Sequence, residues 1–196
     1  MGRTAWTRQL AAMIMGTVLA VCASAQPVER EGVTLEPTVQ LGGSALQLNG
    51  VGVRTRAIFK VYVGALYVPA KSNNPATLIA QKGPRRLQLT MLRNVDADSF
   101  AGPLNDGLKN NHSEAQLAAL KPQIDAFNAV FKSVGEAKKG DVIGIEYLPD
   151  SGTRITVNGQ PKGAPIPGEE FYAALLRIWL GDKPADGDLK KGLLGA

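Results

Sequence analysis

The sequence predicts an α+β fold in which a large antiparallel β-sheet carries a layer of helices on one face. Apolar runs with strand-like alternation and short turn signals fill the chain to about residue 92. Apolar residues at helical spacing follow over residues 97–134, and strand patterns then return before a last helix. Strands and helices segregated in this way are typical of an antiparallel sheet with helices packed against it.

The first 25 residues have the features of a secretory signal peptide. Arg3 and Arg8 give a positively charged start, residues 10–21 form an apolar run, and Ala23-Ser24-Ala25 is a small-residue cleavage site before Gln26. The apolar run is shorter than the roughly 20 residues that cross a bilayer. We therefore expect a mature chain without a transmembrane segment, located in the periplasm or secreted.

Cys22 is the single cysteine. Val21 precedes it, where lipid-attachment signals favour a small residue, so we expect cleavage after Ala25, with lipidation of Cys22 as the alternative. Cleavage there leaves no thiol for a disulfide or a nucleophile.

The mature chain is long enough for one domain with its own core. Residues 26–38 are polar and acidic, which predicts a flexible lead-in, and residues 39–196 form the expected domain. The formal net charge of the chain is +5, and the basic residues alternate with acids rather than forming a stripe. Nucleic acid is therefore not an expected partner.

The first strands are expected as a hairpin. Residues 39–41 and 45–48 flank Gly42-Gly43, which is a turn signal. Residues 51–68 are rich in Val, Ile, Phe and Tyr, which predicts one or two strands buried on both faces at the centre of the sheet. Residues 87–92 form the next predicted strand.

Two helices are predicted over residues 97–134, and Pro122 is expected to kink the second. A second hairpin is predicted from residues 142–148 and 154–157. The last strong helix begins after Pro167-Gly168 and ends at Gly181, and a short segment follows it.

Common catalytic and metal-binding arrangements are absent from the sequence. His112 is the only histidine, and no serine lies in a nucleophile-elbow pattern. A zinc site needs several His or Cys ligands. Gly50-Val51-Gly52 is only the beginning of a glycine-rich phosphate loop. We therefore assign no catalytic residue and expect no metal ion and no cofactor.

Arg54 and Tyr62 form the candidate binding site. Arg54 leads into the most buried strand region, where a charge without a partner is costly. Tyr62 lies in an otherwise apolar run, an even number of residues away. An arginine and a tyrosine hydroxyl that converge in an apolar cavity would bind a carboxylate or phenolate oxygen through charge-assisted hydrogen bonds.

Two stretches surround these residues, 48–56 (LNGVGVRTR) and 59–67 (FKVYVGALY). They resemble the opening strands of the chalcone isomerase family and of the plant fatty-acid-binding proteins that share its fold. Residues 88–91 resemble the next strand of that family, and residues 166–171 and 176–182 look like the ending of its exported bacterial branch.

The resemblance implies an open-faced β-sandwich with a ligand cleft between sheet and helices. It implies that Arg54 matches the arginine that holds the flavanone oxygen in the isomerases and the carboxylate in the fatty-acid binders. Tyr62 matches a tyrosine of the fatty-acid binders, where isomerases carry threonine. The implied ligand is a fatty acid or similar small amphiphile rather than a flavonoid.

Two departures from the isomerases agree with that implication. The isomerases' active-site tyrosine falls on Phe100 and their asparagine on Gly107, if no gap intervenes. A phenylalanine cannot orient a water and a glycine has no side chain to bind with, so chalcone isomerisation is not expected. A slip of a few residues in the alignment would restore an amide from Asn105, Asn110 or Asn111.

The spacing of Arg54 and Tyr62 raises a geometric question. In one straight strand a rise of ~3.3 Å per residue would hold their Cα atoms roughly 26 Å apart. The chain must bend near residues 55–57 for the two to meet, yet no Gly, Pro, Asn or Asp marks a turn there.

Three hypotheses follow. The first is a binding protein for a long-chain carboxylate, with Arg54 at its polar end. The second is an isomerase or lyase that uses Arg54 and Tyr62 to stabilise an enolate or phenolate. The third is a structural role, in which Arg54 pairs with Asp141 or Glu146 and side chains close the cleft. The first is favoured.

Overall fold

The structure is a computed structural model that describes residues 26–195, so the predicted signal peptide and Cys22 lie outside the described residues. The elements follow the predicted order of strands, helices, strands and helix. They are β1 (Val28–Arg30), β2 (Val33–Leu35), β3 (Thr38–Leu41), β4 (Ser44–Arg56), β5 (Phe59–Val68), α1 (Pro75–Ala80), β6 (Arg85–Met91), β7 (Val95–Asp96), α2 (Ala97–Asn111), α3 (Glu114–Ala119), α4 (Lys121–Val134), β8 (Glu136–Ala137), β9 (Val142–Leu148), β10 (Gly152–Val157), β11 (Gln160–Ile166), α5 (Glu169–Leu180) and α6 (Gly187–Leu193).

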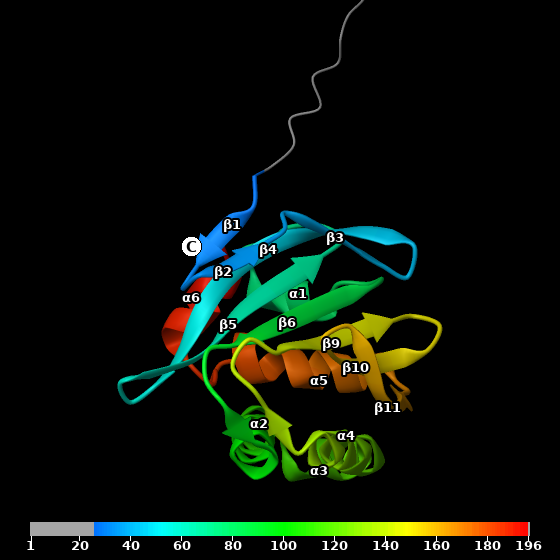
Figure 1. The fold of residues 1–196 in the computed structure, drawn as a ribbon. Coiled ribbons are helices and arrows are strands. Elements are labelled where there is room, and N and C mark those ends of the chain that lie inside the picture. Colours follow the sequence, from blue (N-terminus) through cyan, green and yellow to red (C-terminus); the bar gives the residue numbers. More distant parts are fainter. Residues whose placement is uncertain (1–25, 196) are drawn as a thin grey trace, which may run out of the picture.

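A seven-stranded curled sheet forms the body of the molecule, in the order β11-β10-β9-β6-β5-β4-β3 (Figure 1). Each neighbouring pair is antiparallel. β6 pairs with β9 and not with the next strand in sequence, because the chain leaves the sheet after β6 to form α2, α3 and α4. The predicted α+β fold with a large antiparallel sheet is confirmed.

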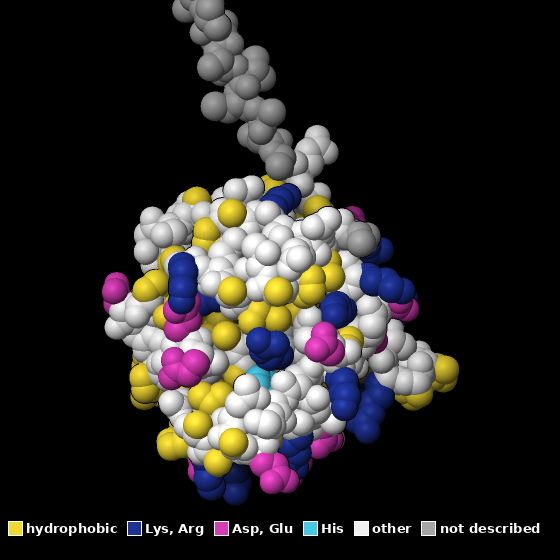
Figure 2. Space-filling view, turned by 180° about the vertical axis from the view of Figure 1, so that it is seen from behind, with side chains coloured by type: hydrophobic (Ala, Val, Ile, Leu, Met, Phe, Trp, Pro, Cys, Tyr) yellow, Lys and Arg dark blue, Asp and Glu magenta, His cyan; other side chains and the backbone are white. Residues whose placement is uncertain are grey.

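The helices lie on one side of this sheet. In Figure 1, α5 runs behind β6, β9 and β10, α6 lies behind β4 and β5, and α2, α3 and α4 lie below. The face toward the helices holds the main core, in which Leu66 and Leu89 on the strands and Leu175 on α5 are fully buried. Figure 2 views the molecule from behind, on the side of α5 and α6, and shows basic and acidic side chains interspersed on that surface.

The strands that carry Arg54 and Tyr62 form a tight hairpin. Residues 51–68, predicted as one or two strands, belong to β4 and β5, and Arg56 and Phe59 face each other across a two-residue turn. Ala57 in that turn has a φ of +54°. A left-handed conformation costs a non-glycine residue about 1–2 kcal/mol. The turn was not marked in the sequence because an alanine adopts the conformation that glycine usually supplies.

Residues 26–38, expected as a flexible lead-in, instead contribute two strands. β1 and β2 pair as an antiparallel hairpin. Leu35 is 1% exposed and packs with Leu46 and Tyr67 in a second cluster on the sheet face opposite the helices. Val33 packs against the same cluster, and this alternation was hidden by the polar residues around it. The fold therefore begins before residue 39.

Pro122 does not kink the second predicted helix but begins a new one. Residues 114–134 divide into α3 and α4 at Leu120, and Pro122 lies in the first turn of α4. Proline is tolerated there because the N–H groups of the first turn have no partner within the helix.

Gly50 and Gly52 make room for α6 rather than for a phosphate. A Cβ atom at Gly52 would lie 2.7 Å from the backbone oxygen of Leu189. The Asn49 side chain donates a hydrogen bond of 2.7 Å to the backbone oxygen of Leu193. The glycine pattern in β4 is thus explained by close packing of the last helix on the strand.

Candidate ligand-binding site

Arg54 and Tyr62 lie directly opposite each other on β4 and β5. The hairpin turn at Ala57 and Ile58 provides the bend that the spacing required. Cα atoms of residues opposed in an antiparallel pair are about 4.5–5.5 Å apart, and their side chains share one face of the sheet. The structure therefore brings the two predicted residues together, on the face toward the helices.

Tyr62 is a protonated hydrogen-bond donor in a buried position. Its side chain is 4% exposed, and its hydroxyl accepts a hydrogen bond of 2.9 Å from Nε1 of Trp179 on α5. Burial raises the pKa of Tyr62 above its usual value, although the nearby Arg54 guanidinium opposes the rise. Since the indole N–H takes the role of donor to this oxygen, the phenol proton is available to a ligand.

Arg54 is half-buried, and no carboxylate among residues 26–195 forms an ion pair with it. The partners expected under the structural hypothesis are engaged elsewhere. Glu146 is paired with Arg86 and Arg154. Asp141 accepts hydrogen bonds from the Asn158 side chain and the backbone of Lys138. Arg54 pairs with neither Asp141 nor Glu146, so this part of the third hypothesis is wrong.

A cavity of about 410 Å³ opens beside Arg54 and Tyr62. Its volume falls within the range of small-molecule sites. Three elements enclose it, namely the β4–β5 hairpin, the segment after β6, and the first half of α2. The residues that line it are Arg54, Arg56, Ala57, Phe59, Val61, Tyr62, Arg93, Asn94, Val95, Asp96, Ser99, Phe100, Pro103 and Leu104.

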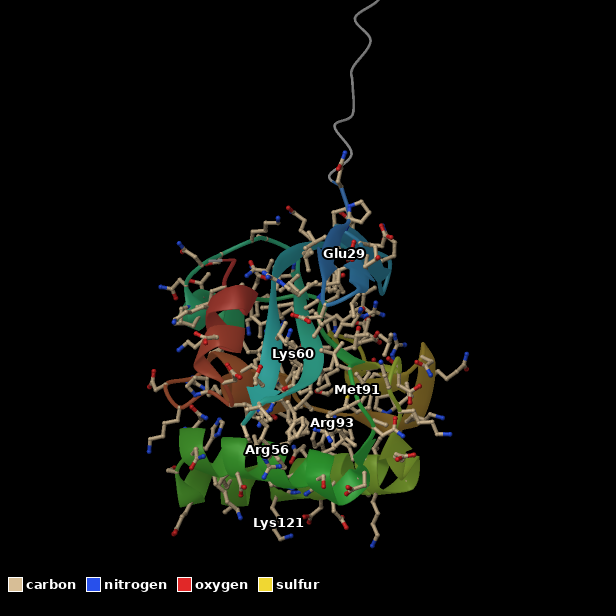
Figure 3. All side chains as sticks on the ribbon, turned by 60° about the vertical axis from the view of Figure 1, so that its left-hand side comes forward. Glu29, Arg56, Lys60, Met91, Arg93 and Lys121 are labelled. Atoms are coloured by element: carbon tan, nitrogen blue, oxygen red, sulfur yellow. The ribbon has the colours of Figure 1, made fainter. Side chains whose placement is uncertain are left out.

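The lining combines an apolar floor with cationic walls. Phe100 and Leu104 are buried residues of the main core that also border the cavity. Arg56 and Arg93 join Arg54, and Figure 3 shows both between the hairpin and the helices below it. Such a combination suits a molecule with an apolar body and an anionic end.

Asp96 is the carboxylate in the lining, and it has a structural role. Its side chain accepts a hydrogen bond of 2.8 Å from the backbone of Ser99 and caps the N-terminus of α2. That hydrogen bond lowers the pKa of Asp96. Its charge is thereby directed to the helix terminus rather than to the arginines.

The two positions matched to isomerase catalytic residues differ in location. Phe100 borders the cavity and stacks on Phe131 with ring centroids 5.0 Å apart. Gly107 lies at the crossing of α2 and α5, where a Cβ atom would be 2.6 Å from Cγ2 of Ile178. A side chain at residue 107 would thus meet α5 and not the cavity.

The asparagines considered as substitutes do not line the cavity either. Asn105 exchanges hydrogen bonds with Asn128 on α4. The Asn111 side chain donates to the backbone oxygen of Lys183. Asn110, the third one considered, is exposed at the last turn of α2.

Within the described residues, no group of three or more His, Cys, Asp or Glu side chains is placed to hold a metal ion. His112 ends α2, where its Nδ1 lies 2.9 Å from the backbone oxygen of Leu108. In residues 26–195 no helix has the length and apolar character of a membrane span.

Three participants were not predicted from the sequence. Arg56 follows Arg54 by two residues, so strand alternation was a usable signal for it. Arg93 lies in the segment after β6, and only the pairing of β5 with β6 brings it near Tyr62. Trp179 lies in the last predicted helix, and its hydrogen bond to Tyr62 depends on the docking of α5.

Comparisons with known proteins agree with this architecture. A family model described as chalcone isomerase-like matches residues 27–195. The crystal structure of a fatty-acid-binding protein from Arabidopsis thaliana is similar in fold, with a TM-score of 0.67 and 14% sequence identity, over 86% of this chain and 96% of that one. No curated protein matches the sequence.

Proposed function

Because the chain belongs to the chalcone isomerase-like family, we propose that it uses the fold's cleft to bind a small amphiphilic carboxylate such as a fatty acid. The observation that carries the proposal is that Arg54, which forms no ion pair with any residue in the range 26–195, lies beside the Tyr62 hydroxyl in an open cavity with an apolar floor. The similar fold of a protein that binds fatty acids supports it.

The geometry assigns a role to each part of the site. The Arg54 guanidinium supplies charge-assisted hydrogen bonds to the carboxylate, and the Tyr62 hydroxyl supplies a further donor. Phe100 and Leu104 contact the apolar chain of the ligand. The phenyl ring of Phe100 carries no proton to transfer, and the absence of a donor at that position favours binding without chalcone isomerisation.

The proposal includes export. The features of the first 25 residues favour cleavage before Gln26 and release to the periplasm or the exterior. Cell fractionation with mass spectrometry of the N-terminus tests this part separately from the ligand.

Native mass spectrometry of residues 26–196 purified from a bacterial periplasm tests the ligand. A fatty acid is expected to accompany the protein and to be lost from Arg54→Ala, because the carboxylate then loses its cation. Arg177→Ala provides a matched control, since Arg177 is exposed on α5 outside the cavity lining. If added fatty acids bind the Arg54→Ala variant as well as the parent, or do not bind the parent, the proposal is wrong.

A further inference from the structure

The tip of the β4–β5 hairpin exposes apolar side chains that contribute little to the core. Ile58 is 85% exposed and Phe59 is 54% exposed. They are adjacent in sequence, at a turn where polar residues are usual. The hairpin projects from the body on the right of Figure 2, with hydrophobic side chains at its end.

Cationic side chains surround this apolar tip. Arg56 and Lys60 flank the turn on the two strands and are exposed. The Arg93 guanidinium lies over the Phe59 ring, 4.7 Å from its centroid. In Figure 3, Lys60 is labelled on the hairpin, and Arg56 and Arg93 below it, toward the helices.

Four carboxylates lie near these cations. Asp186 caps α6 and accepts a hydrogen bond of 3.0 Å from the backbone of Thr55, and Glu136 accepts one of 3.4 Å from the Asn94 side chain. Glu31 forms an ion pair of 2.7 Å with Lys60. Asp96 caps α2. Arg56 and Arg93 are therefore cations at the tip whose charge no ion pair offsets within the described part of the chain.

We propose that this tip docks the protein on an anionic lipid bilayer. An apolar point within a ring of arginine and lysine matches the boundary between acyl chains and anionic headgroups, where the apolar residues insert and the cations remain at the surface. Two apolar residues are too few for the roughly 800 Å² that each partner buries in a stable protein–protein interface. A bilayer needs no such shape complementarity.

Docking through the tip places the cavity at the membrane. Arg56, Phe59 and Arg93 belong to the cavity lining and to the rim of the tip at once. An amphiphile that leaves the bilayer would meet these residues before Arg54 and Tyr62. This loading role rests on the proposed function, whereas docking itself does not depend on it.

Vesicle co-sedimentation of residues 26–196 tests the docking. The protein is expected to sediment with vesicles of phosphatidylcholine and phosphatidylglycerol, to bind pure phosphatidylcholine at least ten-fold more weakly, and to be released by salt. Ile58→Asp should weaken binding to the anionic vesicles at least ten-fold. Val28→Ser serves as the control, because Val28 is another exposed apolar residue but lies in β1.

The outcomes separate the two proposals. Ile58 does not line the cavity, so Ile58→Asp should keep its affinity for a fatty acid measured without vesicles. If the parent protein binds vesicles but no fatty acid, the docking proposal stands and the proposed fatty-acid binding is wrong. A parent that does not sediment, or a folded Ile58→Asp variant that sediments like the parent, would overturn the docking proposal.

Discussion

At the scale of single residues, the hydrogen bond from Trp179 to Tyr62 orients the donor of the site. If the indole N–H holds the phenol oxygen, its loss should leave the hydroxyl free to turn away from a ligand. Trp179→Phe is expected to weaken fatty-acid binding about five-fold, which corresponds to a hydrogen bond of ~1 kcal/mol. Isothermal titration calorimetry measures the change.

Substitution of Tyr62 provides the control for this prediction. In a Tyr62→Phe background the hydrogen bond has no acceptor, so Trp179→Phe should bring no further loss of affinity. An equal loss in both backgrounds would assign the effect of Trp179 to packing in the core instead.

Arg54 and Tyr62 show how far a sequence can lead to a site. Their residue types and their match to the family's motif sufficed to select them. Their meeting depends on Ala57, whose left-handed conformation has no signature in the residue itself. Arg93 could not be predicted at all, because its position follows from the register of β5 against β6.

At the scale of elements, a buried carboxylate ties three strands together. Glu146 on β9 is fully buried and pairs with Arg86 on β6 and Arg154 on β10. Glu146→Ala leaves two neighbouring cations without their shared partner. In urea unfolding, the free energy of unfolding is expected to fall by about 2–4 kcal/mol. We expect a value near the lower end of this range, because both arginines reach solvent and water can hydrate their charge.

An exposed ion pair gives the comparison for Glu146. Lys121 and Asp125 are paired on the surface of α4 and are more than half exposed. Asp125→Ala should change the free energy of unfolding by less than about 1 kcal/mol. Similar losses for both variants would show that Glu146 stabilises the sheet no more than a surface pair does.

Most elements could be predicted from local patterns, and the misses share a cause. The β1–β2 hairpin was missed because its inward-facing apolar residues, the partly buried Val33 and the buried Leu35, are too few to outweigh the polar residues around them. The sequence predicts a kink where α3 ends and α4 begins, because a proline such as Pro122 occurs both at kinks inside helices and in the first turn of a helix. Tertiary packing decides both cases.

At the scale of the whole molecule, all four tyrosines are buried and resist ionisation. Burial raises the pKa of Tyr62, Tyr67, Tyr147 and Tyr172 above the usual value of 10.0, to about 12 for Tyr67. Above pH 10 the unfolded chain loses phenol protons that the folded protein keeps. The free energy of unfolding should therefore fall as pH rises, whereas below that pH these groups contribute no change.

At roughly pH 11, the free energy of unfolding should be lower by about 1.4 kcal/mol for each tyrosine that stays protonated in the folded protein. Urea unfolding at neutral and alkaline pH measures it, and Tyr67→Phe should reduce the loss by one tyrosine's share. Phenolate absorbance should stay low until the protein unfolds. Absorbance that rises near pH 10 while the protein is still folded would contradict the prediction.

The segregation of strands and helices along the chain predicted the fold class because it reflects the topology directly. The chain completes β3 to β6 before it leaves the sheet, and it returns at β9. Local patterns do not indicate how helices dock, and the cavity exists only because α2 approaches the tip of the β4–β5 hairpin.

The packing of α6 on Gly50 and Gly52 has a consequence for the order of events during synthesis. The last helix of the chain covers one of its first long strands, so a ribosome-bound chain that lacks residues 187–193 leaves that part of β4 bare. The hydrogen bond between Asn49 and Leu193 joins residues 144 apart in sequence, and contacts so distant in sequence form late and slowly. Native packing of this part of β4 therefore requires residues 187–193, and the sheet alone does not complete the native state.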